Sequence, residues 1–137
     1  PAAFTLGLSL GRLGAHALDT RLRPMTAVRL AACLALPGFL AAALLSPVWA
    51  LLAAFLLAGI GVGPIEPAVF RAVARRHEGA ARGRTLAAVT AIAYLGYLLS
   101  PPALGWIAGL AGFPALWATT AFAAAAVALL TLIVPRA

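Results

Sequence analysis

Long apolar stretches, separated by short polar or proline-containing breaks, follow one another along the whole chain. Each stretch has roughly the 20 residues that a helix needs to cross the ~30 Å hydrocarbon core of a bilayer. The connections are short, so consecutive helices should be antiparallel neighbours. The pattern predicts an all-α, polytopic transmembrane helix bundle of about five membrane-spanning helices. Their expected positions are about residues 1–18, 25–45, 48–73, 85–110 and 115–134.

Polar residues in the first predicted helix recur at spacings of four, three, four and three residues, which places them on one helical face. Because a membrane helix turns such a stripe away from lipid, this face should point into the bundle. Gly7 and Gly11 form a G-x-x-x-G pair, a spacing that lets helices approach closely. Gly105 and Gly109 repeat that spacing. The stripe consists of Thr5, Ser9, Arg12, His16 and Asp19.

Glycines and prolines interrupt the third predicted helix at 59–67, around the acid Glu66. An acid inside the membrane costs roughly 2.5–3.5 kcal/mol unless it is paired or hydrated. Counting helical rise from Arg71 puts Glu66 about 7–8 Å inside the membrane boundary, and counting from Asp19 puts Arg12 about 10 Å inside. We therefore predict that Glu66 and Arg12 face each other, as a structural ion pair or as a gate. Hydration of Glu66, or its pairing with Arg71, is the alternative.

The fourth predicted helix carries a second polar face. Thr90, Tyr94 and Tyr97 lie at positions i, i+4 and i+7. These tyrosines either contact a substrate or form hydrogen bonds within the bundle. The second predicted helix is apolar on all sides apart from Arg29 near its start, and the fifth carries no charge until Arg136. Both patterns favour lipid-facing positions.

The composition is that of a membrane protein. Of 137 residues, 64% are hydrophobic and 9% are charged, whereas soluble domains carry about 25% charged residues. The net charge of +7 could suggest nucleic-acid binding. The arginines lie in clusters between apolar runs, however, where they act as topology signals. The predicted partner is therefore a lipid bilayer and not a nucleic acid.

Arginines are confined to alternate connections along the chain. Short arginine-rich loops stay in the cytoplasm, so loops 19–24 and 74–84 and the C-terminus are predicted to be cytoplasmic. The uncharged turns would then lie outside. All three tryptophans are close in sequence to those turns, which favours an aromatic belt at the outer interface. They are Trp49, Trp106 and Trp117.

Residue patterns for catalysis or metal binding are weak. His16 and Asp19 share a face, but Cys33 is the sole cysteine and no second intramembrane histidine is available, so no metal site is expected. His16 stays a hypothesis for proton relay, because histidine titrates near neutral pH. The glycines at 59–63 do not match a nucleotide-binding loop. We therefore predict that the chain is not an enzyme and uses no cofactor.

Several segments resemble the major facilitator superfamily. Gly-Arg-Leu at 11–13, followed by Asp19 and a basic loop, resembles the connection between the family's eighth and ninth helices. Gly-Ile-Gly at 59–61 with Pro67 resembles the tenth helix. The segment 96–105 resembles the eleventh, in a bacterial subgroup of sugar-permease-like transporters. The chain thus resembles the C-terminal five of twelve helices, the larger part of the C-terminal half of a transporter.

This resemblance implies a secondary active transporter that moves a small solute by alternating access around a midplane site. Proton coupling stays open, and a missing N-terminal half becomes an expected partner. Asp19, with Arg21 and Arg23, would belong to a gating loop in a bacterial cell inner membrane, although Thr20 and Leu22 depart from the family's pattern. The residues expected along the substrate path are Arg12, His16, Glu66, Thr90, Tyr94 and Tyr97.

A rival interpretation is a non-transporting polytopic protein, such as a scaffold or a sensor subunit, that reuses the same bundle. The polar stripes are compatible with both interpretations, since either protein would pair its polar groups away from lipid.

Overall fold

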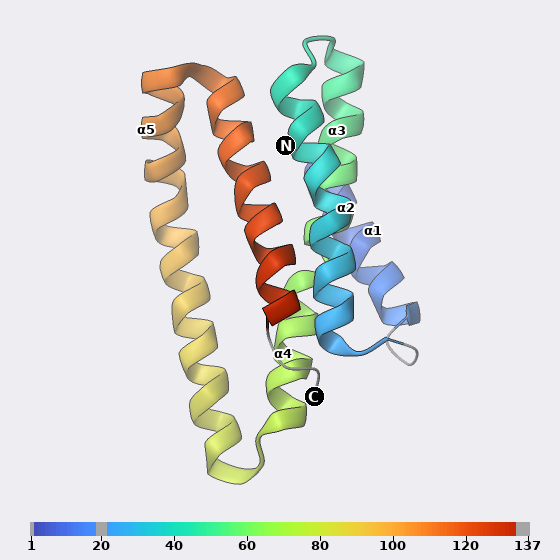
Figure 1. The fold of residues 1–137 in the computed structure, drawn as a ribbon, viewed down its shortest axis with the longest axis vertical. Helices are drawn as coiled ribbons and strands as arrows, with labels where there is room; N and C mark the ends of the chain where they lie inside the picture. The colour runs from blue at the N-terminus through green and yellow to red at the C-terminus, as the bar shows by residue number, and fades with distance from the viewer. Residues whose placement is uncertain (1, 19–21, 134–137) are drawn as a thin grey trace.

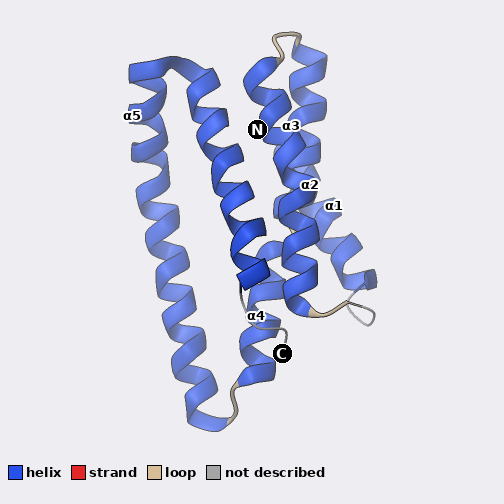
Figure 2. Ribbon diagram, in the orientation of Figure 1, coloured by secondary structure: helices blue, strands red, loops and turns tan. Residues whose placement is uncertain are grey.

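The computed structural model describes residues 2–18 and 22–133. Within these residues the chain is helical and contains no strand, which confirms the predicted all-α class (Figure 1, Figure 2). The helices are α1 (Ala2–Leu18), α2 (Pro24–Leu44), α3 (Val48–Val62), α4 (Ile65–Arg76) and α5 (Gly79–Ile133).

Three stretches of the described residues are long and apolar enough to cross a membrane. The last of them has 55 residues, about 80 Å of helix at the usual rise, which exceeds a ~30 Å hydrocarbon core. The membrane-spanning character is therefore confirmed, while the number of about five crossings stays a prediction. The stretches are Pro24–Leu44, Val48–Arg76 and Gly79–Ile133.

α5 reverses its direction at Gly112, where φ is 80° and ψ is 172°. Glycine adopts a positive φ without steric cost, so the chain folds back here with almost no loop. We call residues 79–111 the first limb of α5 and residues 113–133 the second limb. The limbs run antiparallel in Figure 1, and the bend lies at the same end of the bundle as the α2–α3 connection. The sequence predicted two helices separated by a longer turn.

The predicted helix at 48–73 is divided into α3 and α4. Gly63 and Pro64 keep right-handed helical backbone angles, so the helix is interrupted without a loop. Pro64 and Pro67 lack backbone N–H groups, so the carbonyls four residues before each have no helical donor. The interruption also places Glu66 in the first turn of α4, where the helix dipole favours a negative charge.

α2 packs against α3 on one side and the second limb of α5 on another. Its buried face is rich in small residues, and Ala35 and Phe39 join Ala58, Ala121 and Ala124 in the core. The opposite face exposes leucines. The lipid-facing position of α2 stays a prediction, with which these exposed leucines are compatible. The sequence did not show which face of α2 packs on its neighbours, because hydropathy alone does not separate lipid from an alanine-lined neighbour. The exposed leucines are Leu30, Leu34, Leu40 and Leu44.

Glycines bring α1 and α3 into backbone contact. A side chain at Gly7 would meet the carbonyl of Leu56, and one at Gly59 would meet the carbonyl of Phe4. Small residues at such positions let backbones approach closely, as the G-x-x-x-G spacing predicted for α1. Gly105, in contrast, has open space around it within the described residues. The same spacing on α5 therefore makes no helix contact there.

The three tryptophans do not behave alike. Trp49 and Trp106 are exposed, as an aromatic belt requires. Trp117 instead packs on the core and meets Phe55 edge-to-face, with ring centroids 4.9 Å apart. The bend at Gly112 thus brings Trp117 against Phe55 of α3, while the aromatic belt at the outer interface stays a prediction.

Hydrogen bonds from Arg29 connect α2 to the end of α5. Its Nη2 donates to the carbonyl of Thr131 at 2.9 Å and its Nε to Oγ1 of the same residue at 3.3 Å. Thr131 is only 6% exposed, so this contact lies within the packed interface. A cation near the C-terminal end of a helix also interacts favourably with the helix dipole.

The substitution Arg29→Met should destabilise the protein by about 1.5–3 kcal/mol, the range for hydrogen bonds to charged groups. Methionine keeps the apolar stem but donates no hydrogen bond to Thr131. Thermal unfolding in detergent measures the change, and Arg23→Met, at an exposed position, is the matched control. Equal unfolding temperatures for both variants would contradict a stabilising role of the contact.

Candidate functional site

An ion pair joins α1 to α4. Arg12 Nη2 lies 3.0 Å from Glu66 Oε2, and the side chains are 56% and 43% exposed, respectively. The contact between residues 54 positions apart in the sequence is the one that their matching membrane depths predicted. α1 packs closely on α3, and α4 continues from α3 after the interruption at Gly63. Arg12 on α1 therefore lies beside Glu66 on α4.

A cavity of about 600 Å³ opens beside this ion pair. One wall comes from α1, where His16 lies one helical turn beyond Arg12 and on the same face. The other wall comes from α4, which contributes Glu66 and, one turn later, Phe70 and Arg71. The complete lining is Arg12, Ala15, His16, Glu66, Pro67, Phe70 and Arg71.

The chemistry of this cavity is that of one carboxylate among basic groups. Arg12 and Arg71 are permanently charged, His16 can accept a proton, and Glu66 is the single acid of the lining. Such a set can bind an anionic group or transfer a proton between solvent and Glu66. No cluster of three or more metal-ligating side chains occurs among the described residues.

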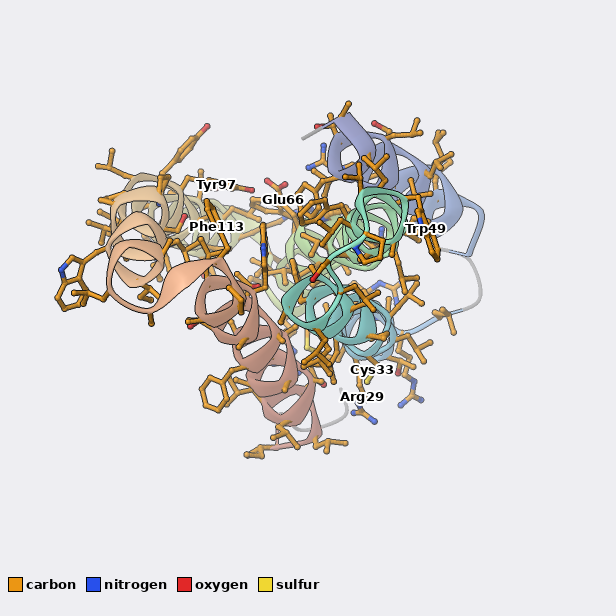
Figure 3. The ribbon with its side chains drawn as sticks, turned by 90° about the horizontal axis from the view of Figure 1, so that it is seen from above. Arg29, Cys33, Trp49, Glu66, Tyr97 and Phe113 are labelled. Carbon is orange, nitrogen blue, oxygen red and sulfur yellow. The ribbon has the colours of Figure 1, made fainter. Side chains whose placement is uncertain are left out.

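The predicted polar residues of α5 lie elsewhere. Tyr94 and Tyr97 are 69% and 64% exposed, and neither these residues nor Thr90 line the cavity. Figure 3, seen along the bundle, shows Tyr97 on the first limb of α5 and Glu66 between that limb and α1. The structure thus brings together Arg12, His16 and Glu66, and keeps the α5 residues on a separate element.

The predicted gating loop is only partly within the described residues. Asp19 and Arg21 lie outside them. Arg23 is exposed and directly precedes α2, without a side-chain cap to that helix.

Phe70 was missed as a cavity residue, and Arg71 was considered only as a partner for Glu66. Phe70 lies four residues after Glu66, so the periodicity that revealed the α1 stripe would also have placed it on the cavity face. Arg29 and Thr131 gave no comparable signal, since a contact between residues 102 positions apart depends on the fold.

The sequence profile of the Major Facilitator Superfamily matches residues 1–137, the whole chain. The chain belongs to the major facilitator superfamily. No curated protein and no solved structure matches it. Membership confirms the family-level resemblance and identifies a multi-pass membrane chain of a transporter family, whose members are generally not enzymes.

Proposed function

We propose that this chain is the C-terminal part of a secondary active transporter of a bacterial inner membrane, comprising the eighth to twelfth helices. The protein moves a small solute by alternating access, with the missing N-terminal half completing the substrate path. Loops 19–24 and 74–84 and the C-terminus are cytoplasmic in this proposal. Support comes from the family match over residues 1–137, from the arginine-rich loops and from the cavity between α1 and α4.

The ion pair between Arg12 and Glu66 is the observation that carries the proposal. It joins the two helices that form the cavity walls, so its breakage would let the walls separate. A proton on Glu66 removes the negative charge that holds Arg12, and an anionic substrate group would compete for the same guanidinium. Either event couples the state of the cavity to a transported species.

The exposed polar face of α5 fits the same proposal. The α1–α4 cavity is not lined by Thr90, Tyr94 or Tyr97. The exposed tyrosines suit one wall of a substrate path whose opposite wall is formed by the other half of the protein. Their hydroxyl groups would then contact the solute or the opposite half.

Glu66→Gln tests coupling through this carboxylate. The complete protein is reconstituted into vesicles and screened for solute accumulation with and without a proton gradient. Glutamine keeps the size and accepts a hydrogen bond from Arg12, but it cannot carry the proton. We expect gradient-driven accumulation to fall at least about tenfold, the effect of ~1.4 kcal/mol, while solute exchange without a gradient persists.

Glu78→Gln is the matched control, because Glu78 is exposed and does not line the cavity. Unchanged accumulation by Glu66→Gln would contradict proton coupling at Glu66. A wild-type protein that accumulates no solute in the screen would favour the rival scaffold or sensor.

A further inference from the structure

A second cavity, which shares Ala15 and Arg71 with the first, lies between α1, α2 and the α3–α4 junction and has a volume of about 210 Å³. Its lining is apolar except for one charged side chain, Arg71. α1 packs chiefly on α3 and makes little contact with α2, so the cavity forms a groove between these helices. Leu10 and Gly14 line it from α1, and Leu30 and Leu34 from α2.

The groove has a charged end and an apolar end. Leu22 lies in the α1–α2 connection, at the arginine-rich end of the bundle, and Arg71 lies in the middle of α4, which leads to that end. Leu34 and Ile60 lie deeper along their helices. From Ala27 to Leu34 the α2 wall extends over about 10 Å of helical rise. A ligand that fits this gradient has an apolar chain and an anionic head.

More positive charge lies near the groove, on the last turn of α4 and at the start of α2. Arg75 and Arg76 line a hollow of about 180 Å³ where α4 meets the start of α2, and Arg23 is exposed beside it. Basic pockets between membrane helices on the cytoplasmic side suit anionic lipid headgroups, and each arginine near the surface contributes about 1 kcal/mol of attraction. A soluble anion would leave the leucine-lined depth of the groove unfilled.

We propose that this groove binds an anionic phospholipid of the adjacent leaflet. One acyl chain lies between α1 and α2, and the phosphate group lies at Arg71. The lipid would hold the cytoplasmic ends of α1 and α2 at a fixed separation. It would lie on the other side of α1 from the face that carries Arg12 and His16.

Lipid retention by the complete protein in mixed-lipid nanodiscs tests the proposal without reference to transport. Bound phosphatidylglycerol and phosphatidylcholine are measured by native mass spectrometry after mild delipidation. The wild type should retain phosphatidylglycerol preferentially. Arg71→Gln should weaken phosphatidylglycerol retention about fivefold and leave phosphatidylcholine retention unchanged. Arg84 is exposed and does not line the groove, so Arg84→Gln should behave like the wild type.

Filling the groove provides a second, independent variant. A side chain at Gly14 meets nothing within 4 Å, so Gly14→Leu occupies the groove without a backbone clash. It should lower retention of both lipids at this site. Gly83→Leu, where the space is also open, is the control. Retention equal to the wild type in both Arg71→Gln and Gly14→Leu would overturn the proposal. So would displacement of phosphatidylglycerol by inorganic phosphate alone, which would mean that the acyl chain contributes no affinity.

Discussion

Gly59→Leu is expected to separate α1 from α3 and to prevent stable folding of the bundle. A β-carbon at this position would meet the Phe4 carbonyl, the Leu8 amide and the Gly7 α-carbon, all of them backbone atoms. Backbone cannot rotate aside as a flexible side chain can, so the helices must move apart. Overpacking typically costs about 1–3 kcal/mol, and we expect the upper part of that range or more, because a whole leucine must be accommodated.

Thermal unfolding and the monodisperse fraction in detergent measure this effect. Gly83→Leu is the matched control, since a side chain there meets open space. It should unfold at or above the wild-type temperature, because leucine is the better helix former by up to about 0.8 kcal/mol. A Gly59→Leu protein as stable as the control would show that α1 and α3 are not in backbone contact.

Reversing either charge of the Arg12–Glu66 pair is expected to have a large effect on transport. Arg12→Glu places two carboxylates where an ion pair stood, and Glu66→Arg does the same with two guanidinium groups. Like charges ~4 Å apart repel by about 1–4 kcal/mol, depending on the local dielectric. Both side chains are about half exposed, so we expect the lower part, ~1–2 kcal/mol, or roughly a 5- to 30-fold loss of uptake.

The double variant Arg12→Glu with Glu66→Arg restores opposite charges at the same positions. A pure gate or structural pair predicts substantial recovery of uptake by the double variant, since attraction does not depend on which helix carries which sign. A carboxylate needed specifically on α4 as the proton carrier predicts no recovery. Full uptake in both single variants would contradict any role of the pair, and the protein yield of each variant separates loss of uptake from loss of folding.

Much of the local structure could be predicted from the sequence. Runs of apolar residues determined the helices, and the polar spacing on the first helix placed Arg12 and His16 on one face, where both line the cavity. Depth counting paired Arg12 with Glu66. These predictions succeed because helical geometry links sequence spacing to face and to depth by fixed increments.

The sequence did not predict contacts that depend on how packed helices are rotated relative to one another. The contact of Trp117 with Phe55 was not predicted. The sequence of α2 is apolar all round and did not show which face packs on its neighbours. Gly105 has the spacing of a packing motif but contacts no neighbouring helix in the described part of the chain. In an apolar chain, a hydrophobic face can contact either lipid or a neighbouring helix, so hydrophobicity alone does not distinguish the two.

The sequence by itself determined a helical membrane chain, its interruption around Gly63 and Pro64, and the pairing of Arg12 with Glu66, because these follow from backbone chemistry and from the cost of placing polar groups in lipid. Only the tertiary structure decided which faces meet. The backbone contact at Gly7 and Gly59 turns α1 so that Arg12 reaches Glu66, and the reversal at Gly112 brings Thr131 back to Arg29. Contacts between residues so far apart in the chain arise from packing of whole helices, which no local spacing encodes.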